Sequence, residues 1–195
     1  GQLYKANYFE FHRDEDVIKL ADDPDYDQTK FEEKLEIKGD NDHTKLIAML
    51  NALNDYSVPM SDILGKYFDT ENLAYWMAFQ LLTGNIDTQS RNMYLYSPTN
   101  SDTFYVLDWD NDGMLMRKEY EIKQRSDGKS WENGISNYWG NMLFSRCLQT
   151  KSFRTALDKA IKDEYKYMNA NRINSMVKHY RSITEQYVWK MPDSM

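Results

Sequence analysis

The stretch GNIDTQSRNMYLYSPTNSDTFYVLDWDNDGML, residues 84–115, combines polar loops with two strand-like runs. The runs NMYLYS and TFYVLDW are short, aromatic and β-branched, and PTNSD between them has turn-forming residues. They predict a β-hairpin with a loop of about five residues. Because a hairpin returns to its starting point, we expect Asn92 to lie beside the acidic cluster Asp108–Asp112, with Asp87 close by.

This predicted cluster carries oxygen ligands of the kind that magnesium prefers, namely carboxylates and amide oxygens. A further carboxylate beside the metal could accept a hydroxyl proton and orient that hydroxyl for attack, which is what phosphoryl transfer requires. Asp87 and Asn92 also have the D-x-x-x-x-N spacing of the catalytic loop of protein kinases. The stretch therefore indicates a phosphotransfer site.

The segment DTENLAYWMAFQLLTG, residues 69–84, is the clearest helix of the sequence. Asp69 or Thr70 suits the N-cap, and Gly84 suits the residue that ends the helix. Apolar side chains surround most of it, which predicts a central buried helix. A second helix, with one apolar face, is predicted from Thr44 in TKLIAMLNALND.

The remaining segments predict a mainly helical α+β fold. QLYKA near the start reads as a strand, and the charged residues 13–42 read as a solvated connector of loops and short helices. Three amphipathic helices are predicted at residues 137–150, 152–168 and 171–189, with their Met and aromatic stripes in the core.

Composition excludes several classes of protein. The chain has 195 residues, which suits one domain, and its net charge of −7 argues against binding to nucleic acid. No membrane span and no signal peptide can be recognised, and the opening on a strand suggests a processed fragment. The lone Cys147 is expected to be a buried, inert thiol, and the three histidines lack metal-ligand spacing.

The acidic loop has a second interpretation. Asp108, Asp110, Asp112, Gly113 and Glu119 match the calcium-binding loop of an EF-hand. An EF-hand loop is entered from an amphipathic helix, whereas TFYVLDW is strand-like. We therefore do not expect an EF-hand, although the chemistry of the loop would allow Ca²⁺ to bind.

The segments GNIDTQSRNMYLY and FYVLDWDNDGML together resemble the spore-coat protein H (CotH) kinase family. Members of that family show an Asp-containing loop, an N-Y-Y-L-Y-like strand and a W-D-x-D motif. GQLYKA, LIAMLNALND, LAYWMAFQLLTGN and SFRTALDKAI also look like that family, in the same order. The resemblance implies a protein-kinase-like C-terminal lobe with a β-hairpin that carries the metal and catalytic loops. It implies one domain over residues 1–195 that lacks the N-terminal ATP-binding lobe.

The resemblance also implies roles for individual residues. Asp87 corresponds to the catalytic-loop Asp, Asn92 to its metal or phosphate partner, and Asp110 to the principal metal-binding Asp. Asp112 would be a second ligand. Asp108 stands where many family members have Pro, so it receives no role.

The function implied is that of a metal-dependent protein serine kinase, which transfers the γ-phosphate of ATP with Mg²⁺ or Mn²⁺. Without the ATP-binding lobe, this fragment could bind metal and be inactive in turnover of ATP. Its substrates would be Ser-rich, basic proteins, and its location the spore coat, the secreted fraction or the cell surface. Two alternatives stay open. The first is a pseudokinase that acts as a coat-assembly or surface binding module, and the second is a calcium-binding domain that uses residues 108–119.

Overall fold

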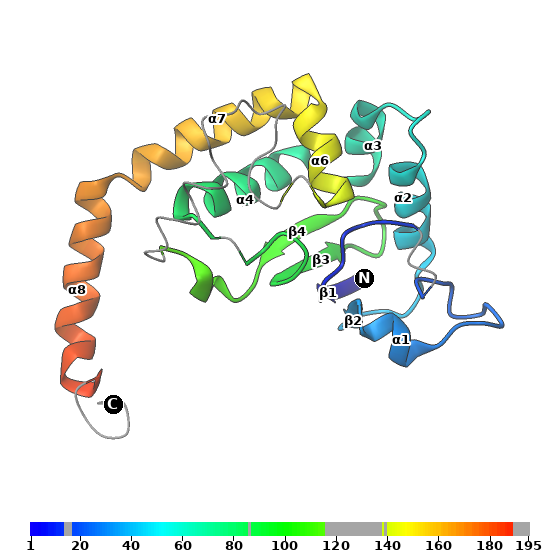
Figure 1. Ribbon diagram of the computed structural model, residues 1–195, viewed down its shortest axis with the longest axis horizontal. Coiled ribbons are helices and arrows are strands. Elements are labelled where there is room, and N and C mark those ends of the chain that lie inside the picture. Colours follow the sequence, from blue (N-terminus) through cyan, green and yellow to red (C-terminus); the bar gives the residue numbers. More distant parts are fainter. Residues whose placement is uncertain (14–16, 86, 116–137, 139, 189–195) are drawn as a thin grey trace.

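The computed structural model describes residues 1–13, 17–85, 87–115, 138 and 140–188. Within these ranges a strand, a short helix and a second strand are followed by a run of helices, a pair of strands and a second run of helices (Figure 1). Their bounds, in chain order, are β1 Gln2–Ala6, α1 Gln28–Glu32, β2 Leu35–Ile37, α2 Thr44–Asn54, α3 Met60–Tyr67, α4 Thr70–Thr83, β3 Met93–Ser97, β4 Tyr105–Asp108, the 3-10 turn η1 Asn111–Gly113, α6 Met142–Gln149, α7 Lys151–Tyr167 and α8 Ala170–Val188.

The sheet is antiparallel and has four strands in the order β2-β1-β3-β4. The predicted hairpin is confirmed, because Met93 of β3 pairs with Asp108 of β4. On its other edge β3 pairs with β1, where Lys5 is opposite Tyr94. The hairpin therefore forms one edge of a larger sheet. The α+β, mainly helical class is confirmed for the described residues.

Helix α4 is the central buried helix that the sequence predicts. The Asp69 side chain caps its start by accepting a hydrogen bond from the Asn72 amide at 2.9 Å. Gly84 ends it in the left-handed conformation at φ 62°, which glycine adopts without strain. Trp76 and Met77 are buried, and α4 packs against both β4 and α7. The helix thus delivers the polar loop that follows it to the end of the hairpin.

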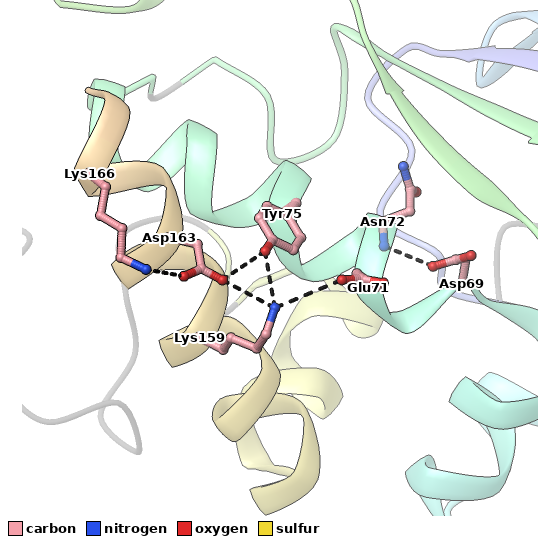
Figure 2. A network of polar contacts seen from close by, with 7 residues as sticks. All are labelled: Asp69, Glu71, Asn72, Tyr75, Lys159, Asp163 and Lys166. Atoms are coloured by element: carbon pink, nitrogen blue, oxygen red, sulfur yellow. Dashed lines mark hydrogen bonds and ion pairs between the residues drawn. The ribbon is translucent and has the colours of Figure 1, made fainter. Parts of the chain in front are cut away.

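A polar network covers the outer side of the seam between α4 and α7 (Figure 2). Tyr75 of α4 donates a hydrogen bond to Asp163 of α7 at 3.0 Å. Lys159 and Lys166 bind the same carboxylate, at 3.1 and 2.7 Å. Lys166, followed by Lys159 and Tyr75, holds the pKa of Asp163 well below its usual range.

The charged connector, residues 13–42, was predicted to be merely solvated, and this is wrong for part of it. Phe31 is fully buried and stacks on the buried His43 ring at 4.2 Å between centroids. Tyr4 of β1 and Tyr26 of the connector contact the two ring nitrogens of His43, at 2.8 and 3.2 Å. Burial lowers the pKa of His43. The connector therefore contributes to the core beside β1.

The C-terminal helices divide into two kinds. Helices α6 and α7 bury apolar side chains, and Cys147 is fully buried, which raises the pKa of its thiol. The prediction that α8 places its apolar stripe in the core is wrong. None of its residues is buried, and the helix extends away from the body of the molecule (Figure 1). Its exposed apolar residues are Met176, Val177, Tyr180, Ile183, Tyr187 and Val188.

Candidate functional site

Asp87 and Asn92, at the entrance to β3, are in direct contact. The Asn92 side-chain amide donates a hydrogen bond to Oδ2 of Asp87 at 3.1 Å. The backbone of Asn92 is left-handed at φ 56°, a conformation that asparagine adopts more readily than most residues. The five-residue spacing therefore folds back on itself, and both side chains lie at the end of the hairpin.

The acidic loop after β4 packs against the same polar segment. A Cβ atom on Gly113 would lie 2.8 Å from Oδ1 of Asn85 and 3.1 Å from Cβ of Asp87. The Asn85 amide also donates to Oδ1 of Asn111 at 3.2 Å. Asp110, at the start of η1, is left-handed at φ 52°. The two loops that the sequence predicted to meet are thus in contact, at a distance that only glycine permits.

Arg91 provides the positive charge of this cluster. Its Nε donates to Oδ1 of Asp87 at 2.8 Å, and its Nη2 contacts the same oxygen. Its Nη1 reaches the Tyr8 hydroxyl, and the guanidinium lies 4.9 Å above the Tyr8 ring. Asp87 raises the pKa of Arg91, and Asp110 adds to this through its charge. Both carboxylates therefore favour the charged form of Arg91.

Asp108 has a different environment from the other loop carboxylates. Its Oδ1 accepts a hydrogen bond at 2.7 Å from Gln80, which is buried in α4. Burial of the carboxyl group raises the pKa of Asp108, and the bond from Gln80 opposes this. Asp108 is exposed as a whole residue, as Asp110 and Asp112 are, but it alone of the three is bonded to α4 by a hydrogen bond that the structure shows. Asp108 thus anchors the loop to α4.

The calcium interpretation finds no support in the described residues. Strand β4, and not a helix, leads into the loop, and η1 follows it. This agrees with the expectation that the loop is not an EF-hand. Glu119, the last residue of the calcium pattern, lies outside the described residues.

The donor atoms fit magnesium that is bound together with phosphate. Because the amide nitrogen of Asn92 faces Asp87, its amide oxygen is directed away and can meet a cation. Asp110 adds an exposed carboxylate, and Asp112 is exposed in the same turn. Magnesium in ATP sites takes one or two carboxylates, with phosphate oxygens and water as the other ligands. In the described part of the chain, no three His, Cys, Asp or Glu side chains come together to hold a metal alone.

A comparison with protein families identifies the group to which this fold belongs. The model of the family described as CotH kinase protein matches residues 1–195. The chain belongs to the CotH kinase family. The resemblance found in the sequence is thus confirmed over the whole chain, and kinase membership implies ATP, a divalent metal and protein substrates in general. No curated protein matches the chain.

Sequence reasoning missed several residues of this CotH-family site. Asn85 and Gly113 join the two loops, and Arg91 binds the predicted catalytic Asp87. The adjacency of Arg91 to Asn92 was a usable signal, because a cation beside a predicted phosphate site is expected. The contribution of Tyr8 had no local signal, since it comes from the segment after β1, far away along the chain.

Proposed function

We propose that this CotH-family domain is a metal-dependent protein serine kinase, with Asp87 as the carboxylate that orients the serine hydroxyl. In this assignment Asn92 and Asp110 hold the magnesium, and Asp112 is an additional ligand. The observation that carries the proposal is the contact of Asn92 with Asp87 at 3.1 Å, beside a loop that Gly113 brings against Asp87. Carboxylate, amide oxygen and metal-binding loop are the parts that phosphoryl transfer requires.

The chemistry assigned to these residues is a single displacement. The serine oxygen forms a bond to the γ-phosphorus while the bond from that phosphorus to the leaving ADP oxygen breaks. The serine proton passes to Asp87, whose two carboxylate oxygens contact Asn92 and Arg91 in the structure without substrate. Magnesium held by Asn92 and Asp110 would neutralise the negative charge of the phosphate groups.

The charge of the molecule supports basic substrates. The net charge is −7, and Asp110 and Asp112 are exposed at the site. Opposite charges raise the rate at which a substrate associates. We therefore propose Ser-rich, basic proteins as substrates, and a location in the spore coat, the secreted fraction or the cell surface, which rests on the family resemblance.

A phosphorylation assay of the complete parent protein on Ser-rich basic peptides, with ATP and magnesium, tests the assignment. Asp87→Ala should lower the transfer rate by at least about 100-fold, because the group that orients and deprotonates the hydroxyl is lost. Asp110→Ala should cause a comparable loss through the metal. Asp158→Ala, on the exposed face of α7, is the matched control and should leave the rate unchanged. Equal incorporation of phosphate into the peptides by the wild type and all three variants would refute the kinase assignment.

Gly113→Ala probes the same site without removing a chemical group. The new Cβ would meet Asn85 at 2.8 Å and must push the two loops apart. The rate of transfer should fall by about tenfold or more, because small displacements of catalytic groups are costly. Gly140→Ala is the control, since a Cβ there meets no atom within 4 Å. A rate in Gly113→Ala equal to that of the control would show that contact between the loops is not needed.

A second candidate, a non-catalytic binding module on the same fold, is favoured by the exposed apolar residues of α8. Exposed apolar surface on a helix suits contact with another protein. Under this function the protein would not phosphorylate peptides, and Asp87→Ala would leave its function intact. The assay above thus separates the two candidates.

A further inference from the structure

The guanidinium of Arg91 contacts the carboxylate to which the proposed function assigns the serine hydroxyl. Its Nε and Nη2 contact one oxygen of Asp87, and the charge of Asp110 contributes to the raised pKa of Arg91. These are the residues to which the proposed function assigns the hydroxyl and the metal.

The surroundings of Arg91 hold the side chain in place while leaving part of it accessible. The Tyr8 ring lies beneath the guanidinium and its hydroxyl meets Nη1. The Phe9 amide donates to the Ser90 carbonyl at 2.7 Å, which ties the Tyr8 segment to the loop of Arg91. The side chain of Arg91 is still 36% exposed, so that a ligand can reach it.

Three of the five non-glycine residues with positive φ in the described part of the chain belong to the segments of the candidate site, and the other two are Phe11 and Leu115. Tyr8 has φ 53°, Asn92 φ 56° and Asp110 φ 52°. All three lie in the left-handed region of backbone conformation, which residues other than glycine rarely adopt. Tyr8 lacks the short polar side chain that makes this conformation easier for Asn and Asp. Strained backbone often occurs at functional sites, so these three conformations agree with a site at this end of the hairpin.

We propose that Arg91 binds the γ-phosphate of ATP during transfer. While the nucleotide is absent, Arg91 pairs with Asp87, which balances its charge. The proposal rests on the proposed kinase function. A guanidinium offers paired N–H donors that match phosphate oxygens. Transfer spreads charge over the three outer oxygens of the phosphoryl group, and a cation placed there stabilises that charge. When Arg91 turns to the phosphate, Oδ1 of Asp87 becomes free to accept the serine proton.

The alternative is a purely structural ion pair between Arg91 and Asp87. Comparison of two nucleotides separates the alternatives, because ADP lacks the γ-phosphate that the non-hydrolysable ATP analogue AMP-PNP carries. Dissociation constants for both, with magnesium, are measured by titration calorimetry on the wild type and on Arg91→Gln. Arg91→Gln should weaken AMP-PNP by about 10- to 100-fold and leave ADP within about twofold.

Three further variants refine this test. Arg91→Lys keeps the charge without the paired donors and should lose only part of the affinity for AMP-PNP. Tyr8→Phe keeps the ring and removes the hydroxyl, so it should cause a smaller loss of the same kind. Arg172→Gln, whose guanidinium lies over Tyr167 at 5.8 Å, is the matched control and should bind both nucleotides as the wild type does.

The possible results are distinct. Unchanged affinity of Arg91→Gln for AMP-PNP, or an equal loss for both nucleotides in a variant that unfolds at the wild-type temperature, would overturn the role of Arg91 and leave the kinase proposal standing. A wild type that binds neither nucleotide would overturn the proposed function, and the role of Arg91 with it. A loss confined to AMP-PNP supports both.

Discussion

Helices α7 and α8 follow one another in the chain and look alike in sequence, yet only α7 is part of the core. Both have an amphipathic pattern with apolar residues at helical spacing. Phe153, Leu157 and Ala160 of α7 are buried against neighbouring helices, whereas α8 buries none of its residues. Periodicity reveals that a helix has a face that suits a partner. It does not reveal whether the partner lies within the same domain.

Helices α7 and α8 also differ in what their polar side chains contact. The exposed side of α7 is tied to α4 by the network around Asp163 (Figure 2). On α8, the Arg181–Glu185 pair at 3.5 Å joins two residues of the same helix. Helix α7 thus fixes α4, which in turn carries the polar loop of the candidate site. Stability and site geometry should therefore respond to changes in α7 far more than to changes in α8.

The largest expected effect comes from the apolar face of α7. Leu157→Ala leaves a cavity in the core and should lower the free energy of unfolding by about 2–5 kcal/mol. Val177→Ala, at an exposed apolar position of α8, should change it by less than about 0.5 kcal/mol. Denaturant unfolding of both variants measures the difference. A comparable loss in the two would show that α8 is packed in solution.

The second effect concerns Glu164 of α7. Burial raises the pKa of Glu164 from 4.5 to about 7, and the charge of Asp108 adds to this. Between pH 4.5 and about 7 the folded protein therefore keeps a proton on Glu164 that the unfolded protein has released. The free energy of unfolding consequently falls as pH rises through this window. Glu164→Gln should remove this dependence and be more stable than the wild type at pH 8. The gain should be about 1–2 kcal/mol, because solvent screens a partly exposed carboxyl group.

Thermal unfolding at several pH values checks the prediction for Glu164. The curves of wild type and Glu164→Gln should converge toward acidic pH and separate above neutrality. Glu185→Gln in α8 is the control and should follow the wild type. Parallel curves for wild type and Glu164→Gln would contradict the account of this carboxyl group.

The smallest effect is expected from the network of Figure 2. Tyr75→Phe removes the hydroxyl that meets Asp163 at 3.0 Å and Lys159 at 3.2 Å. Because these groups are largely solvated, the fall in unfolding temperature should be smaller than the change for Glu164→Gln, and salt should reduce it. The pKa of Asp163 is depressed, so its contribution is present near neutral pH and is lost as acid protonates the carboxylate. No change at low salt would show that the network is not formed in solution.

Local signals predicted the parts of the fold that depend on local chemistry. The Asp69 cap and Gly84 bound helix α4, and the turn residues between two β-rich runs defined the hairpin. Strand β2 and helix α3 were missed. The three residues of β2 are too few for a pattern and depend on their pairing with β1.

The candidate site shows the same division. Connectivity alone predicted that Asp87, Asn92 and the loop of Asp110 would meet, and the contacts of Asn92 and Gly113 with Asp87 agree with this. The contact of Arg91 with Tyr8 could not be predicted, because it depends on how the segment after β1 crosses the end of the sheet. The roles assigned to these residues stay predictions.

The most direct test of the site is to locate the metal. Manganese, added in small amounts together with AMP-PNP to isotopically labelled protein, broadens the resonances of nearby amides. We predict that the signals of Asn92, Asp110 and Gly113 are lost first and that those of α8 persist, with the effect abolished in Asp110→Asn. Broadening centred on Asp163 of α7, with Asn92 and Asp110 unaffected, would contradict the placement of phosphoryl transfer at the end of the hairpin.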